Sequence, residues 1–220
     1  MNRATNPTGE AAGTGRLAFI WLFGGIIEWT IQYLNRWLYP SSAGGNLPFQ
    51  AAAGDVCAVF FYLWKWPKMF ALSRIRPQPA DLVLGVMLGY LMTNIQAAML
   101  GRSALNNDWL LTNPHRKLTF LCAVLIVPIA EELIYRAAIL GSLLERTSTF
   151  WAVTLTVIAA TIMHDVWWMA LPGQILLCAA YVFRSRSLVS SITAHMVANA
   201  LVFAPSLLIA FHVGIGKARA

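Results

Sequence analysis

Charged side chains are scarce in this sequence. Only 11% of its 220 residues are Asp, Glu, Lys or Arg, whereas 58% are hydrophobic. Because a soluble domain carries about 25% charged residues, this deficit excludes an ordinary soluble fold and indicates an integral membrane protein. The net charge is +7, but the basic residues lie between apolar runs. In that position they set membrane topology and contact anionic lipid, so we expect a lipid bilayer and no nucleic acid as partner.

Cysteine is also scarce, and several catalytic signatures are missing. Cys57, Cys122 and Cys178 lie far apart in apolar runs. An odd, dispersed set forms neither a disulfide framework nor a C-x-x-C metal site, so we expect small packing side chains. The patterns G-x-S-x-G, S-x-x-K and H-E-x-x-H are absent. This excludes the hydrolases that carry those nucleophile and zinc motifs.

Long apolar runs are abundant. A membrane-spanning helix needs about 20 consecutive apolar residues, and the sequence offers seven candidate runs, of which the sixth is short for a full crossing. They cover residues 17–38, 49–66, 80–100, 118–144, 149–168, 172–183 and 188–213. The sequence therefore predicts an all-α, polytopic membrane helix bundle of about seven transmembrane helices, within a range of six to eight.

The ends of the chain differ in composition from the runs. Residues 1–15 are polar and small, which predicts a disordered cytoplasmic tail. Residues 16–220 then form a single membrane domain. The basic segment 65–76 contains Lys65, Lys68, Arg74 and Arg76. Positive loops stay on the cytoplasmic side, so we expect the N-terminus to be cytoplasmic.

Two adjacent carboxylates interrupt the fourth apolar run. Glu131, Glu132 and Arg136 are the only charged residues between positions 118 and 144. A carboxylate at mid-membrane depth costs about 3 kcal/mol on insertion scales, so each needs a partner or a function. Arg136 follows Glu132 by four residues and shares its helical face. Glu131 points about 100° away on the same helix, so we expect it to lack that partner.

Two histidines lie in later apolar runs. His164 belongs to the fifth run, and His195 belongs to the seventh, where Asn199 follows on the same helical face. At about 1.5 Å per residue, Glu131 and both histidines can reach the middle third of the membrane. The spacing therefore favours one polar site built from three helices.

These residues resemble a known family. The order E-E-x-x-x-R at 131–136, a histidine at 164 and H-x-x-x-N at 195–199 is similar to the CAAX protease and bacteriocin-processing (CPBP, Abi) family of intramembrane glutamic endopeptidases. The resemblance covers residues 118–205, which we expect to be the catalytic core. Arg184–Leu188 also resembles the family's R-T-G-S-L stretch, with Arg186 in place of glycine. The family's phenylalanine four residues before the histidine is Ala160 here.

The resemblance implies a catalytic assignment. Glu131 would activate a water as general base, and His164 would help to orient that water. His195 and Asn199 would donate hydrogen bonds to the oxyanion, and Glu132 with Arg136 would support the site. No cofactor is implied. The substrate would be a membrane-embedded or membrane-anchored protein or peptide cut near its terminus, and the compact size resembles bacterial members of the inner (plasma) membrane.

Two alternatives use the same residues. In the first, Glu131, His164 and His195 ligate zinc, and a water completes the site. In the second, the protein is a non-catalytic scaffold or a transporter, since intramembrane acids and histidines also mark ion pathways.

Overall fold

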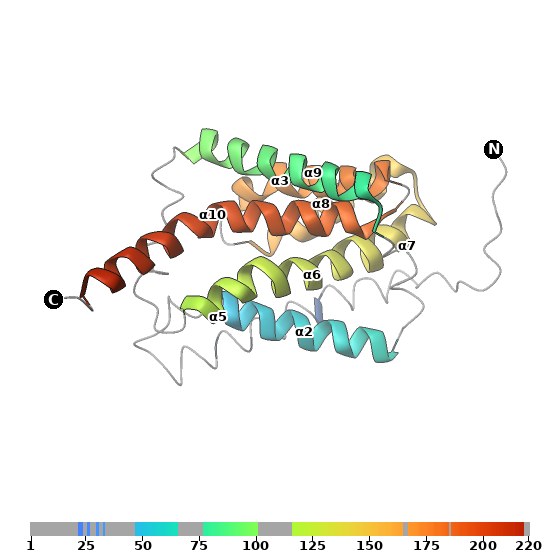
Figure 1. The fold of residues 1–220 in the computed structure, drawn as a ribbon. Helices are drawn as coiled ribbons and strands as arrows, with labels where there is room; N and C mark the ends of the chain where they lie inside the picture. Colours follow the sequence, from blue (N-terminus) through green and yellow to red (C-terminus); the bar gives the residue numbers. More distant parts are fainter. Residues whose placement is uncertain are drawn as a thin grey trace.

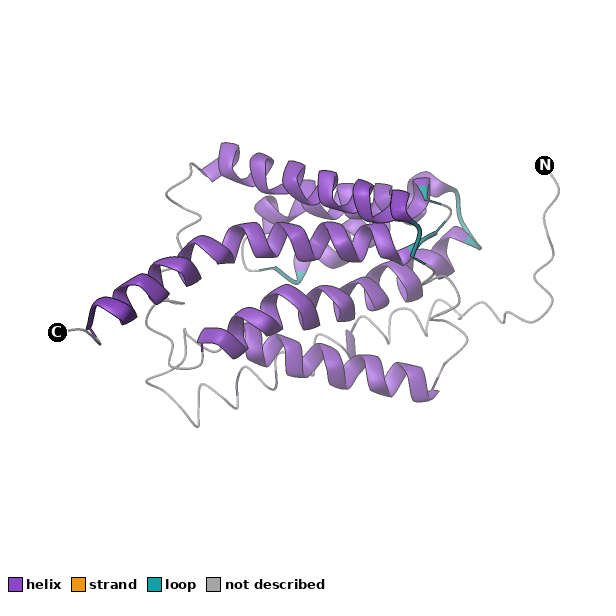
Figure 2. Cartoon of the chain, viewed as in Figure 1, coloured by secondary structure: helices purple, strands orange, loops and turns teal. Residues whose placement is uncertain are grey.

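The described part of the chain is helical throughout (Figures 1 and 2). The computed structural model describes residues 47–65, 77–100, 116–164, 167–184 and 186–217, together with Leu22, Phe23, Ile26, Thr30 and Tyr33. Within these residues six separate helices occur, so the predicted all-α membrane fold is confirmed, whereas the count of seven is not. The predicted tail, most of run 17–38 and the basic segment beyond Lys65 lie outside the described residues.

One long helix runs through the middle of the described bundle. It comprises α5 (Arg116–Leu121), the π-helical segment η5 (Cys122–Ile126), α6 (Val127–Glu132), a second π-helical segment η6 (Leu133–Leu140) and α7 (Gly141–Leu144). The other five helices are α2 (Leu47–Lys65), α3 (Pro79–Leu100), α8 (Thr149–Ile162), α9 (Trp167–Phe183) and α10 (Leu188–Lys217).

Within the described residues, three helices have the length and composition of membrane spans. The spans are Pro79–Met99, Lys117–Leu144 and Leu188–Pro205, and shorter apolar helices cover Val56–Lys65, Thr149–Ile162 and Trp168–Phe183. Of the three spans, Lys117–Leu144 is the most buried, because neighbouring helices cover it. The segment with the two glutamates is therefore screened from lipid by protein over much of its length.

The predicted boundary between the fifth and sixth runs is wrong. α8 ends at Ile162, His164 lies in a bend, and α9 begins at Trp167, so Pro172 lies inside α9 and not at its start. His164 and Asp165 are polar residues in the otherwise apolar segment 163–171. The prediction placed them inside the fifth run, whereas α8 ends before His164. The start of α8 follows a local rule, since the hydroxyl of Ser148 accepts from the backbone N–H of Trp151 at 3.5 Å.

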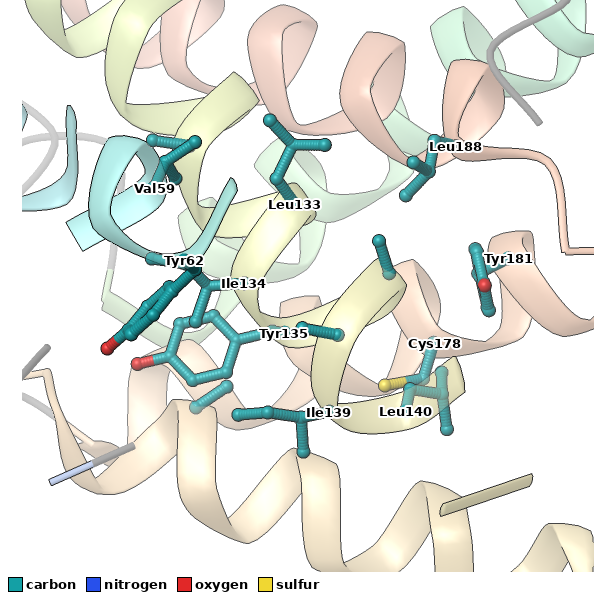
Figure 3. Close-up of a cluster of buried hydrophobic side chains, with 14 of the residues drawn as sticks. Val59, Tyr62, Leu133, Ile134, Tyr135, Ile139, Leu140, Cys178, Tyr181 and Leu188 are labelled. Atoms are coloured by element: carbon teal, nitrogen blue, oxygen red, sulfur yellow. The ribbon is translucent and has the colours of Figure 1, made fainter. Parts of the chain in front are cut away.

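A large apolar cluster holds the central helix against its neighbours. Tyr62 of α2, Leu140 of η6 and Cys178 and Tyr181 of α9 are fully buried there, and Tyr135 is nearly so (Figure 3). The three cysteines are free thiols; two are buried, and Cys57 is exposed. The cluster thus packs the central helix against α2 and α9.

Glycines let α3 approach α10 closely. A Cβ atom on Gly89 would lie 2.6 Å from the carbonyl oxygen of Ala194, and one on Gly85 would lie 2.5 Å from the Cβ of Thr193. Small residues four apart are a common device for bringing membrane helices together. Ala194 immediately precedes His195, so this contact helps to set the position of the histidine's backbone.

Candidate active site

A buried ion pair forms the base of the site. Arg136 Nε lies 3.2 Å from Glu132 Oε2, and both side chains are fully buried. Arg136 Nη2 also donates to Gln174 Oε1 of α9 at 2.5 Å. The pairing predicted from the four-residue spacing is confirmed. Gln174 was not predicted, although an amide inside the otherwise apolar α9 sequence was the available signal.

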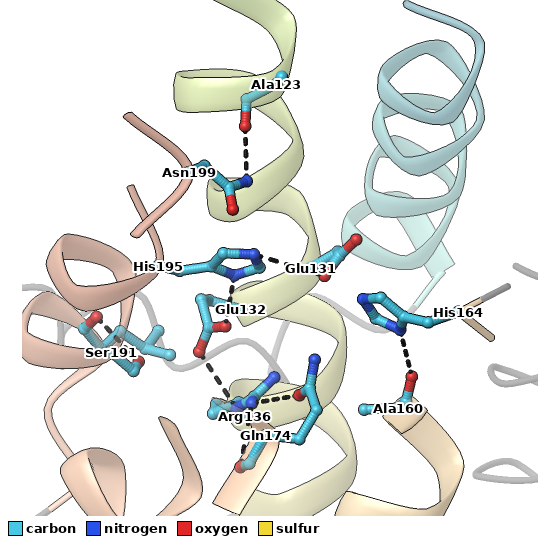
Figure 4. A network of polar contacts seen from close by, with 11 residues as sticks. Ala123, Glu131, Glu132, Arg136, Ala160, His164, Gln174, Ser191, His195 and Asn199 are labelled. Atoms are coloured by element: carbon cyan, nitrogen blue, oxygen red, sulfur yellow. Dashed lines mark hydrogen bonds and ion pairs between the residues drawn. The ribbon is translucent and has the colours of Figure 1, made fainter. Parts of the chain in front are cut away.

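His195 connects this ion pair to the second glutamate. Its Nδ1 lies 3.1 Å from Glu132 Oε1, and its Nε2 lies 3.9 Å from Glu131 Oε2 (Figure 4). A carboxylate paired with arginine is a hydrogen-bond acceptor, so Nδ1 carries the hydrogen. Nε2 is thereby turned toward Glu131. The structure thus brings Glu131, Glu132 and His195 together from two helices.

Glu131 differs from Glu132 in its contact with His195: Glu132 Oε1 is 3.1 Å from Nδ1, whereas Glu131 Oε2 is 3.9 Å from Nε2. Its Oε2 atom is buried and makes no hydrogen bond within the described residues, and the side chain is 17% exposed. Arg136 instead pairs with Glu132, as the 100° offset predicted. A buried acceptor without a partner costs about 1–3 kcal/mol. Glu131 is therefore the carboxylate of the pair that can take a proton from a bound molecule.

His164 faces Glu131 from the side opposite His195 (Figure 4). It lies in the bend after α8, and its Nδ1 is 2.9 Å from the carbonyl oxygen of Ala160. A carbonyl only accepts, so Nδ1 again carries the hydrogen, and the other ring nitrogen is turned toward the glutamates (Figure 4). The contact uses the backbone of residue 160. The alanine that replaces the family's phenylalanine therefore leaves this hydrogen bond intact.

Asn199 is anchored to the backbone of the central helix. Its Nδ2 donates to the carbonyl oxygen of Ala123 at 2.7 Å, and its amide oxygen is on the His195 side (Figure 4). Asn199 and His195 do share one face of α10, as predicted. The sequence analysis did not foresee Ala123 as the partner, because a backbone carbonyl in an apolar run has no signature of its own.

The Arg184–Leu188 stretch holds the start of α10 rather than contacting the glutamates. Arg184 Nε donates to Asp81 Oδ1 at 2.6 Å, and Ser187 Oγ donates to Asp81 Oδ2 at 3.1 Å. Asp81 is only 2% exposed and lies in the first turn of α3. Arg186 has φ = 66°, a conformation that favours glycine. This accounts physically for the glycine in the family's motif.

Two further questions from the sequence concern metal binding and Asp165. Among the described residues, no three His, Cys, Asp or Glu side chains are arranged to hold a metal ion. Asp165, next to His164, lies outside the described residues. The residues brought together are thus Glu131, Glu132, His195 and, across from them, His164.

Comparison with known proteins extends the motif evidence. Residues 113–201 match a family model described as "Type II CAAX prenyl endopeptidase Rce1-like". No curated protein and no solved structure matches the chain. The matched segment contains both glutamates, both histidines and Asn199. Together with the three candidate spans, the match indicates an integral membrane protein.

Proposed function

Residues 113–201 belong with the CAAX protease family, and from this premise we propose that the chain is an intramembrane endopeptidase that uses a glutamate-activated water. Its substrate is a membrane-associated protein or peptide, cut near its terminus. The observation that carries the proposal is the placement of His195, which is 3.1 Å from Glu132 and 3.9 Å from Glu131. One imidazole thus lies between Glu132, which also pairs with Arg136, and Glu131.

Glu131 acts as the general base. The 3.9 Å between its Oε2 and His195 Nε2 is longer than a direct hydrogen bond, which spans up to about 3.2 Å. A water between the two atoms can contact both. Glu131 removes a proton from this water, the oxygen attacks the carbonyl carbon of the scissile bond, and the carbonyl oxygen becomes an oxyanion. The proton then passes to the leaving amine as the C–N bond breaks.

One imidazole orients the water, and the other forms a hydrogen bond with the oxyanion. Each uses Nδ1–H in a hydrogen bond, to Glu132 in His195 and to Ala160 in His164. A neutral ring therefore presents a lone pair at Nε2, which orients the water, whereas a protonated ring donates from Nε2 to the oxyanion. Removing one oxyanion donor costs about 3 kcal/mol in comparable sites. We assign the orientation of the water to His164 and the hydrogen bond to the oxyanion to His195.

Glu132, Arg136 and Gln174 support His195. The ion pair has no exposed surface, and Gln174 ties it to α9. Because Glu132 accepts from Nδ1, it selects the ring orientation that presents Nε2 to Glu131. Their role is to hold His195 and not to contact the substrate.

The location of the site supports a substrate within or attached to the membrane. Glu131 and His195 lie inside two candidate spans, Lys117–Leu144 and Leu188–Pro205. The matched family is named for prenyl substrates; for this chain we propose the broader class of membrane-anchored or membrane-embedded proteins and peptides. We further propose a bacterial plasma membrane location with a cytoplasmic N-terminus.

The test compares wild-type protein with Glu131→Gln in the native membrane. We expect peptides cut by the enzyme to show new N- and C-termini in wild-type membranes and to remain intact with Glu131→Gln. Glu145→Gln is the matched control, because Glu145 is a partly exposed glutamate beyond α7 that pairs with Arg186. Full turnover by a folded Glu131→Gln protein would reject the mechanism.

A further inference from the structure

We infer that Pro128 and Asn199 form a hydrogen-bond latch that positions His195, an inference that rests on the proposed function. The latch is the contact from Asn199 Nδ2 to the Ala123 carbonyl oxygen, at 2.7 Å, together with the proline that leaves this carbonyl available. It gives Asn199 a positioning role in place of the oxyanion-donor role implied by the family resemblance.

The backbone around Pro128 explains why the Ala123 carbonyl needs a partner. In the π-helical segment η5, the N–H of Val127 donates to Cys122, five residues back. In an α-helix the same N–H would donate to Ala123. The next N–H along the chain would belong to Pro128, which has none. Neither Val127 nor Pro128 therefore donates a backbone hydrogen bond to the Ala123 carbonyl.

Asn199 supplies the missing donor. Ala123 is only 4% exposed, so an unpaired carbonyl there would be costly. The acceptor is an oxygen, and only the amide nitrogen of Asn199 can donate to it, which settles the orientation of the amide group. The amide is thus committed to the helix backbone, with its NH₂ group turned away from His195 (Figure 4).

The latch acts one helical turn from the catalytic histidine. Asn199 follows His195 by four residues, which is about 6 Å along α10. The central helix and α10 are therefore joined at both ends of this turn, by Asn199 with Ala123 and by His195 with Glu132. On the α3 side, Gly89 packs against the Ala194 carbonyl. With α10 held from both sides, His195 Nε2 stays directed at Glu131.

A double-mutant cycle on stability tests the hydrogen bond without requiring activity. The variants are Asn199→Leu, Pro128→Ala and the double mutant, unfolded as purified protein in detergent. Pro128→Ala restores a backbone N–H that can take the Ala123 carbonyl. We therefore expect Asn199→Leu to lower the unfolding midpoint clearly in the wild-type background and little beside Pro128→Ala. Equal decreases in both backgrounds would overturn the latch. Pro205→Ala, at an exposed proline in α10, is the control background, in which Asn199→Leu should keep its full effect.

The same cycle on kinetics tests the positioning role. We expect Asn199→Leu and Pro128→Ala each to lower kcat about tenfold with KM unchanged, and the double mutant to be no slower than either, because residues that act as one unit are not additive. If the decreases in kcat of the two single mutants instead multiply in the double mutant, Asn199 acts directly on the substrate and the positioning role is overturned. A wild-type protein that cleaves nothing would instead reject the proposed function, while the stability cycle would still decide whether the latch exists.

Discussion

His195 and Glu132 form a hydrogen bond of 3.1 Å between Nδ1 and Oε1, although 63 positions separate them in the chain. Glu132 is fully buried and His195 nearly so. The bond leaves Nε2 as the ring nitrogen that faces Glu131. The two adjacent glutamates therefore have distinct surroundings. Glu132 pairs with Arg136 at 3.2 Å and with His195 at 3.1 Å, whereas Glu131 has the longer contact with His195, at 3.9 Å.

The first prediction concerns the buried ion pair. Glu132→Gln leaves the buried Arg136 without its charge partner, and removing one member of such a pair costs about 3–5 kcal/mol. We expect a large drop in the unfolding midpoint in detergent. The double mutant Glu132→Gln with Arg136→Met should recover part of the loss, because the uncompensated charge is gone. Unchanged stability of the single mutant would contradict this interpretation.

The second prediction concerns the left-handed backbone at Arg186. Its φ of 66° is unfavourable for a residue with a Cβ, by about 1–2 kcal/mol. We expect Arg186→Gly to raise stability by about 1 kcal/mol, since the lost Arg186–Glu145 pair is partly exposed at 3.7 Å and such pairs contribute little. Arg186→Ala is the control: it loses the pair and keeps the strain. An alanine variant as stable as the glycine variant would count against backbone strain.

The third prediction concerns the packing of α3 on α10. A side chain at Gly89 meets the backbone oxygen of Ala194 at 2.6 Å, and backbone cannot move aside as a flexible side chain can. We expect Gly89→Ala to shift α10 and lower kcat about tenfold, as misplaced catalytic groups do. Gly173→Ala is matched in size, but its Cβ meets only the terminal carbon of Met92, at 3.1 Å. That variant should keep nearly full activity; equal losses in both would disprove a specific role for Gly89.

The fourth prediction concerns metal dependence. Because the proposed base is the Glu131 carboxylate, dialysis of the purified protein against a strong chelator should leave the cleavage rate unchanged. Measuring the rate before chelation, after it and after addition of zinc separates the two mechanisms. A loss that zinc reverses would favour the alternative in which Glu131, His164 and His195 ligate the metal.

Features that depend on local spacing and composition could be predicted from the residues alone. Few charges and long apolar runs led to the all-α membrane fold, and a four-residue spacing led to the pair of Glu132 with Arg136. Both follow from helical geometry and from the cost of placing charge in lipid. Helix ends were harder to predict. His164 was expected within a span and lies instead in a bend after α8, although the polar pair of His164 and Asp165 was a signal in the sequence.

Contacts between side chains far apart in the chain became known from the packing of the helices. Gln174 reaches Arg136, Asp81 receives Arg184 and Ser187, and Asn199 finds a carbonyl on another helix. Sequence spacing predicts none of these partners. The periodicity of a helix defines its own faces, but it does not say which other helix packs against each face. The π-helical segment η5 was equally hidden from the sequence, since it lies where Pro128 lacks an N–H and where Asn199 of α10 donates to the Ala123 carbonyl.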